Sequence, residues 1–252
     1  MPKIFNAYPD GLNRFFYNCY KLNNIPEDYF DTWNFNRIQT YSYAGASYVF
    51  YYCNSLRKVP KHLLDNLWGI NSSVSSVFYY SLFNNCWSLD EVIGLAVQNA
   101  SLTSNGLGST FSNCYRLKDM TFQTNEDGTP KTAKWKSQTL DLSYNVGYTL
   151  TASNIINANN GITADKEVKD DATYQALKDD PDWFATNLNY SRYNHDSAVR
   201  TINSLPDCSA TGTNTIKFKG ACGGSTDGGA INTLTEEEIA VATAKGWTVS
   251  LV

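Results

Sequence analysis

The chain has 252 residues, of which 42% are hydrophobic, 14% aromatic and 17% charged. This length fits one large domain or two small ones, and the composition argues against a disordered chain or a coiled coil. The formal net charge is −4, from 20 basic and 24 acidic residues, so we expect no basic nucleic-acid-binding face. There is no run of about 18 apolar residues, so we expect no segment inserted in a membrane.

The beginning of the chain bears on where the protein is found. Residues 1–10 lack the apolar segment of about 7–15 residues that marks a secretory signal peptide. We therefore expect the protein to be made and used in the cytoplasm, or to leave it by a route that needs no signal. A shortened form of a longer protein would look the same.

A sequence repeat occupies residues 12–121. The cysteines of successive copies are 34, 33 and 28 residues apart. Self-similarity of this kind is typical of solenoids, in which each unit buries its apolar face against its neighbours. The pattern is F-x-x-C-x-[KSR]-L-x-x-[IVM], and its four copies begin at Phe16, Phe50, Phe83 and Phe111.

The spacing inside one copy predicts its local structure. Phe and Cys, three residues apart, are expected on one side of a tight helical turn, pointing inward. The Leu and the following Ile, Val or Met are expected to flank a short strand, which Pro26 and Pro60 end in the first two copies. We predict burial of the motif's Phe and Leu side chains: Phe16, Phe50, Phe83, Phe111, Leu22, Leu56, Leu89 and Leu117.

The six cysteines invite a disulfide interpretation, but their positions favour another. Cys19, Cys53, Cys86 and Cys114 occupy equivalent places, so we expect a ladder of reduced thiols. Metal binding would need C-x-x-C or Cys/His clusters, which are absent, and we expect neither a metal nor a cofactor. The other two cysteines, Cys208 and Cys222, are as consistent with a pair as with free thiols.

Tyrosines crowd a part of the chain that is poor in charge. Residues 66–89 and 92–115 contain no charged residue. Tyrosine offers rigid, amphipathic contact area that suits recognition of sugars or proteins, although inward-facing tyrosines would simply fill the core. The candidate binding residues are Tyr41, Tyr43, Tyr48, Tyr51, Tyr52, Tyr79 and Tyr80.

The F-x-x-C-x-x-L-x-x-I-P unit resembles the BspA-type leucine-rich repeat. That family includes bacterial and mycoplasma surface proteins and fibre proteins of gut-bacterial phages. The resemblance covers residues 12–121, and the longer period here indicates insertions in the return segments. It implies an α/β leucine-rich-repeat-like solenoid with short parallel strands and short helices or turns, followed by a C-terminal α/β cap.

The rest of the chain predicts a linking part at 122–163 and a C-terminal part at 164–252, after the repeat domain at 1–121. Residues 122–137 are expected to form a loop or hairpin tip, and 139–145 a strand and turn like those of a leucine-rich repeat. Residues 164–184 are charged and helix-prone.

The C-terminal part predicts the order helix, strand, helix, strand. Asp196 is expected as the N-cap of a helix ending before Pro206, and 215–219 as a strand. Thr233 and Glu236 are expected as a capping box for a helix ending at Gly246, followed by a strand at 247–252. Parts of 197–206, 215–220 and 238–249 resemble C-terminal segments of phage fibre proteins.

No catalytic residue can be nominated. His195, Asp196 and Ser197 include the residue types of a triad, but adjacent residues cannot orient one another in that way. Asp90 and Glu91 are neighbours and are expected to be exposed, so they do not form the carboxylate pair of a glycosidase.

These observations leave three functional hypotheses. We favour a non-enzymatic phage virion protein, a fibre or surface-decoration module that is made in the host cytoplasm, exposed on the particle and able to bind a host glycan or protein. The alternatives are a bacterial surface adhesin and, less favoured, a polysaccharide-active enzyme. For the favoured virion protein, the expected partners are other virion proteins or copies of itself, with a trimer favoured by family resemblance. The expected assembly residues, at an uncapped N-terminal end, are Ile4, Phe5, Tyr8, Phe15 and Tyr17.

Overall fold

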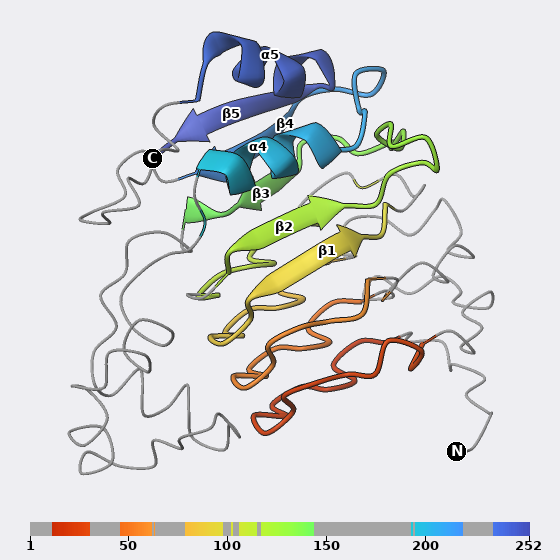
Figure 1. The fold of residues 1–252 in the computed structure, drawn as a ribbon, viewed down its shortest axis with the longest axis vertical. Helices are drawn as coiled ribbons and strands as arrows, with labels where there is room; N and C mark the ends of the chain where they lie inside the picture. The colour runs from red at the N-terminus through yellow and green to blue at the C-terminus, as the bar shows by residue number, and fades with distance from the viewer. Residues whose placement is uncertain are drawn as a thin grey trace.

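The computed structural model shows an α/β protein with short parallel strands in two small sheets and two short helices. The successive turns and strands lie one above another, from the N-terminal turns at one end to the last helix and strand at the other (Figure 1). The residues that the structure describes are 12–30, 46–61, 63, 79–97, 102, 106–114, 117–143, 193, 195–218 and 234–252.

Each copy of the Phe-x-x-Cys motif forms the predicted tight turn. In all four copies the Cys N–H donates to the Phe carbonyl three residues earlier, at 3.0–3.1 Å. The Leu N–H then donates to the Cys carbonyl, at 2.9–3.1 Å. Two consecutive turns therefore bring Phe, Cys and Leu to the same side, as their spacing indicates.

Hydrogen bonds join each turn to the next one. The N–H groups of Phe16, Phe50 and Phe83 each donate to a carbonyl of the following turn at 2.9 Å. The residues two positions before and two after each of these Phe residues donate in the same direction. In all four turns these flanking residues have left-handed backbones, with φ between +51° and +63°: Arg14, Asn18, Tyr48, Tyr52, Ser81, Asn85, Ser109 and Asn113.

The Phe rings form a continuous stack through the four turns. Neighbouring ring centroids are 5.4, 5.4 and 5.5 Å apart, with interplanar angles of 13°, 5° and 21°. This spacing is constant although the intervals between the copies differ, so the return segments absorb the differences in length. Six of the eight side chains predicted to be buried are fully buried, but Phe16 and Leu22 are only partly buried. These two belong to the first described turn, whose Phe ring stacks on only one other ring of the Phe series.

The cysteines form a ladder of free thiols, as predicted. Cys53, Cys86 and Cys114 each donate to the Phe carbonyl of the preceding turn, at 3.1, 2.9 and 3.1 Å. Burial raises the pKa of all three thiols well above its ordinary value, so they stay protonated and keep these bonds. Cys208 is also a free, buried thiol, whereas Cys222 lies outside the described residues.

The first sheet is parallel, with β1 (Glu91–Leu95) beside β2 (Asp119–Phe122). A short strand was expected after the third and fourth motifs, but Val92 and Met120, which were expected to flank it, lie within β1 and β2. In the second copy the pairing is reduced to an isolated bridge between Lys58 and Glu91. The Thr124–Pro130 bridge closes the hairpin tip predicted after β2.

The second sheet is also parallel, in the order β3 (Thr139–Asp141), β4 (Asn214–Phe218) and β5 (Trp247–Leu251). Its three strands agree with the predictions for 139–145, 215–219 and 247–252. The helix-prone segment 164–184 lies outside the described residues.

Helix α4 (His195–Ser204) packs on β2, as Figure 1 shows. It begins one residue before Asp196, which therefore lies in its first turn and is not the predicted N-cap. Its Ser197 and Thr201 hydroxyls donate to the carbonyls of residues 118 and 120, and Ser204 Oγ accepts from the N–H of residue 122. Ser197 and Thr201 are four residues apart, a rise of about 6 Å in the helix, and the carbonyls they bond are two residues apart, about 6.6 Å in the strand, so these two bonds stay in register.

Replacing Thr201 by Val should lower the free energy of unfolding by about 1–3 kcal/mol, because the Met120 carbonyl and the buried Tyr193 hydroxyl lose their hydrogen bonds to it. Thr243→Val is the matched control, since within the described part of the chain the exposed Thr243 hydroxyl bonds only a carbonyl of its own helix, α5 (Glu236–Ala244). Urea unfolding of both variants measures the difference. Equal effects would contradict a role of Thr201 in holding α4 on β2.

Helix α5 begins with a capping box, but at other residues than predicted. Thr235, not Thr233, is the N-cap, and its partner is Glu238. Gly246 follows the helix with φ +79°, as predicted for the C′ position. Lys245 Nζ donates to the carbonyls of Ile202 and Asn203 at 2.9 and 2.7 Å, which caps the C-terminal end of α4.

An ion pair also joins the beginnings of the two helices, since His195 Nε2 lies 3.0 Å from Glu238 Oε2. Glu238 raises the pKa of His195, so this contribution to stability is present below the ordinary value of 6.5 and is lost as pH rises through the folded pKa. The pKa of Glu238 is lowered, chiefly by the Thr235 backbone and then by His195, so its contribution is lost in acid, below its ordinary 4.5.

We therefore expect the melting temperature to fall between about pH 6 and pH 8.5, and His195→Gln to reduce this fall. Thermal melts of both proteins at the two pH values measure it. An unchanged pH dependence in the variant would show that His195 does not carry the effect.

One apolar core runs through both sheets. Trp135 is fully buried, and its ring packs edge-on against Tyr79, Phe122 and Trp247, with centroids 6.5, 5.7 and 6.5 Å away. It thereby connects the stacked turns to the second sheet. Among the described residues, no helix has the length and apolarity needed to cross a membrane.

Candidate functional site

Aromatic side chains line the outside of the stacked turns. The ring of Tyr51 stacks on Tyr17 at 5.0 Å and an interplanar angle of 7°, and it contacts Tyr48 and Tyr52 at 5.5 and 4.8 Å. Tyr48 in turn contacts Tyr80 in the third turn, at 5.4 Å. We call these five residues the tyrosine ladder.

A positive charge lies beside the tyrosine ladder, and part of the ladder is exposed to solvent. The Arg14 guanidinium lies 5.5 Å from the centroid of the Tyr17 ring and 5.4 Å from that of Tyr48, which is cation–π geometry. Tyr17 and Tyr52 are 39% and 37% exposed, so their rings can be covered by a partner. Burial, followed by neighbouring groups, raises the pKa of Tyr48 and Tyr51, so both keep a hydroxyl proton to donate.

Not every predicted tyrosine belongs to this surface. Tyr79 was a candidate binding residue, but it is fully buried and its hydroxyl donates to the Ala96 carbonyl at 2.6 Å. It is a core residue because its position in the turn faces inward, whereas that of its neighbour Tyr80 faces outward. Tyr41 and Tyr43 lie outside the described residues.

The predicted assembly surface is described only in part. Phe15 is 40% exposed, and its ring packs edge-on against Phe16. Tyr17 is exposed as expected, but it also belongs to the tyrosine ladder. Ile4, Phe5 and Tyr8 lie outside the described residues.

A row of amides continues the outer surface into the third and fourth turns. Asn113 Nδ2 donates to Asn85 Oδ1 at 2.9 Å, and Trp87 Nε1 donates to the same oxygen at 3.2 Å. Neither this row nor Arg14 was predicted from the sequence. The signal was present, because Asn precedes Cys in three of the four motifs and tolerates the left-handed backbone found there.

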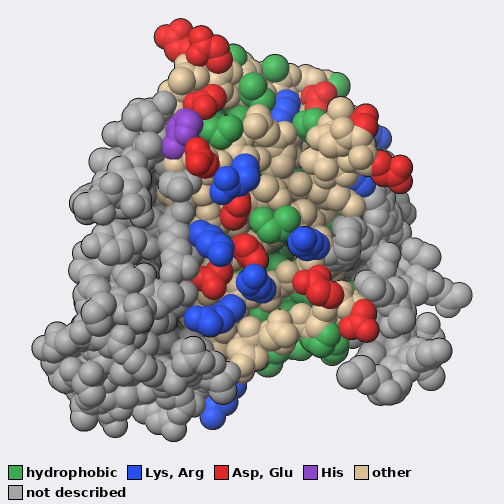
Figure 2. All heavy atoms as spheres, viewed as in Figure 1, with side chains coloured by type: hydrophobic (Ala, Val, Ile, Leu, Met, Phe, Trp, Pro, Cys, Tyr) green, Lys and Arg blue, Asp and Glu red, His purple; other side chains and the backbone are tan. Residues whose placement is uncertain are grey.

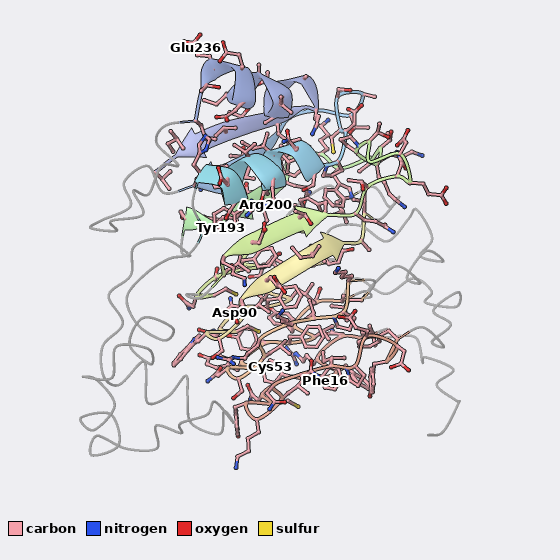
Figure 3. All side chains as sticks on the ribbon, viewed as in Figure 1. Phe16, Cys53, Asp90, Tyr193, Arg200 and Glu236 are labelled. Carbon is pink, nitrogen blue, oxygen red and sulfur yellow. The ribbon has the colours of Figure 1, made fainter. Side chains whose placement is uncertain are left out.

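The face seen in Figure 2 carries interspersed acidic and basic side chains. Lys58 pairs with Glu91 at 2.7 Å, and Arg200 with Asp119 at 2.7 Å. Lys58 thereby lowers the pKa of Glu91. The expectation that Asp90 is exposed was wrong, since only 9% of its surface is exposed. It lies directly before β1 (Figure 3).

The triad residue types come together only in part. His195 Nδ1 lies 3.5 Å from Asp196 Oδ1, but its Nε2 atom contacts Glu238, and the Ser197 hydroxyl donates to the Lys118 carbonyl at 2.6 Å. Within the described ranges there is no group of three or more His, Cys, Asp and Glu residues placed to hold a metal ion.

Comparisons with protein-family models, with curated proteins and with solved structures found no match. A proposal about function therefore depends on the geometry of the tyrosine ladder and on the resemblance of the repeated motif.

Proposed function

We propose that this protein is a non-enzymatic recognition module of a phage virion, a fibre or surface-decoration part built as a leucine-rich-repeat-like solenoid. It binds a glycan or protein on the host surface through the tyrosine ladder. The stacked motif turns and their Phe rings support the solenoid, and the BspA-type motif supports the virion assignment.

The observation that carries the binding role is the backbone of Tyr48 and Tyr52. Both have left-handed φ values, +57° and +59°. The other turns have Arg or Ser at the first of these positions and Asn at the second. A left-handed backbone disfavours bulky residues by about 1–2 kcal/mol, and such strain clusters at functional sites. The second turn therefore holds two tyrosines outward at a cost to stability.

The chemistry of the ladder suits a carbohydrate. Tyrosine rings offer flat apolar area for the C–H faces of sugars, and their hydroxyls form hydrogen bonds. Ring-to-ring contacts limit the freedom of the side chains before binding, which reduces the entropy lost on association. Arg14 and the Asn85–Asn113 row place further donors and acceptors on the neighbouring surface.

The replacement Tyr52→Asn separates function from folding. We expect it to raise the free energy of unfolding by about 1 kcal/mol, because Asn tolerates the left-handed backbone, and to weaken binding to host cells and to a glycan array. Tyr20→Asn is the control, because Tyr20 is 55% exposed and lies outside the ladder. Unchanged binding by Tyr52→Asn would argue against the proposed function.

Within the virion we propose that the chain contacts other virion proteins or copies of itself, as a trimer, through its N-terminal end. The exposed Phe15 supports this surface, whereas Tyr17, also expected there, is assigned to the tyrosine ladder. Light scattering of the purified chain tests for the trimer, and mass spectrometry of purified phage particles tests whether the chain is part of the virion. A chain that is a monomer in solution and absent from the particles would contradict both claims.

A further inference from the structure

A cavity of about 750 Å³ lies at the carboxyl ends of β1 and β2, apart from the tyrosine ladder. A β-bulge lies at its edge, where the pairing of the two strands shifts between Val92 and Leu95. At the bulge the Gly94 N–H donates to the Thr121 side chain at 3.0 Å. Gly94 has φ +73°, and a Cβ atom there would lie 3.1 Å from the Lys61 carbonyl oxygen, so this bulge depends on glycine.

The lining of this cavity combines three kinds of group. Lys61 and Lys131 contribute ammonium groups, and Ile93 contributes apolar surface. Gln123 contributes an acceptor: its Oε1 atom is buried and has no hydrogen-bond partner in the described part of the chain. A buried acceptor of this kind disfavours the folded protein unless a ligand supplies a donor. Glu126 adds one carboxylate to the lining, so the two lysines leave a net charge of +1.

We propose that this cavity binds a hexuronic acid residue of an acidic polysaccharide. Its carboxylate pairs with the lysines, a hydroxyl donates to Gln123 Oε1, and a C–H face of the ring lies on Ile93. Sulfate fits less well, because it has no proton to donate to Gln123 and, as a dianion, is repelled by Glu126 more strongly than a single carboxylate is. The volume is within the range of about 300–1,000 Å³ that small-ligand sites occupy, which is enough for a sugar at a chain end.

This inference does not rest on the proposed function, because none of its residues belongs to the tyrosine ladder. The test is calorimetric titration of the full chain with D-glucuronate, with glucose and inorganic sulfate as matched ligands. Of these three compounds we expect only glucuronate to bind, with a dissociation constant in the millimolar range.

Three variants locate the site. We expect Lys131→Met and Gln123→Leu each to weaken glucuronate binding about tenfold, the effect of one lost charged or neutral hydrogen bond. Gln123→Leu should not lower the melting temperature, because it removes an unsatisfied buried oxygen. Lys134→Met, which replaces an exposed lysine outside the cavity, is the control and should bind as the wild type does.

Three results would each overturn the proposal. The first is that glucuronate does not bind at about 50 mM, a concentration far above the expected dissociation constant. The second is that glucose or sulfate binds as well as glucuronate, and the third is that both cavity variants bind glucuronate as the wild type does. Loss of glucuronate binding in Tyr52→Asn together with full binding by Lys131→Met would place the sugar on the ladder and equally reject this site.

Discussion

Replacing Phe83 by Ala is expected to lower the free energy of unfolding by about 3–5 kcal/mol, as for other buried aromatic residues. Phe83 is fully buried, and its ring lies between those of Phe50 and Phe111 at 5.4 and 5.5 Å. The smaller side chain would leave a cavity that interrupts the ring stack in its middle. Neighbouring turns are joined by backbone hydrogen bonds on both sides, which limits how far the stack can close.

Phe15→Ala is the matched control, because Phe15 belongs to the same series of turns but is 40% exposed. We expect it to change stability by less than about 1 kcal/mol. Denaturant unfolding followed by circular dichroism measures both variants. A loss of stability in Phe83→Ala as small as that in Phe15→Ala would mean that the Phe stack does not hold the turns together.

Trp135→Ala should also lower the free energy of unfolding by about 3–5 kcal/mol, but for a different reason. Its ring contacts Tyr79 on the side of the turns and Trp247 on the side of the second sheet, so it joins two parts of the core. Its loss should therefore uncouple them. We expect the variant to unfold in two steps when turn and sheet signals are followed separately, because cooperative unfolding depends on a shared core.

The comparison for Trp135 is Trp135→Phe, which keeps much of the apolar volume and should lose less stability. Because the chain has six tryptophans, fluorine NMR of fluorotryptophan-labelled protein follows Trp87, in the turns, separately from Trp247, in the second sheet, and far-ultraviolet circular dichroism reports on the backbone. A single, coincident transition with little loss of stability in Trp135→Ala would contradict the role of Trp135 as the connection between the two sheets.

The stacked part of the fold was predictable from the sequence because its signal is repeated. Each copy places Phe, Cys and Leu three residues apart, and this spacing brings them to one side of consecutive turns. Repetition then implies that equivalent side chains contact one another, as the Phe rings and the thiols do. The free state of the thiols followed from the same argument.

Other features depend on contacts that no single segment contains. Tyr79 and Tyr80 are neighbours in sequence, yet one is core and the other surface, because that choice depends on the phase of the turn. The sequence of α4 does not indicate what its hydroxyl groups bond, because their acceptors belong to the segment of β2, which is distant in sequence. The capping box was predicted two residues early because Thr233 and Thr235 are each followed by Glu three residues later, and only the structure shows which pair begins the helix.

The sequence predicted that the candidate site is rich in tyrosine, but not which residues form it. Four of the seven predicted tyrosines, Tyr48, Tyr51, Tyr52 and Tyr80, lie in the ladder. Tyr17 was predicted for assembly instead, because its stacking on Tyr51 depends on the turns lying in register. Arg14 was missed for the same reason.

The most direct test of the tyrosine ladder is nuclear magnetic resonance of the chain with ring-labelled tyrosine, titrated with a glycan that it binds. We expect the ring signals of Tyr17, Tyr51 and Tyr52 to shift with the glycan concentration. The signals of the buried Tyr79 and Tyr193 should stay in place, and so serve as internal controls. Saturable binding that leaves the ladder signals unchanged would contradict the proposed function.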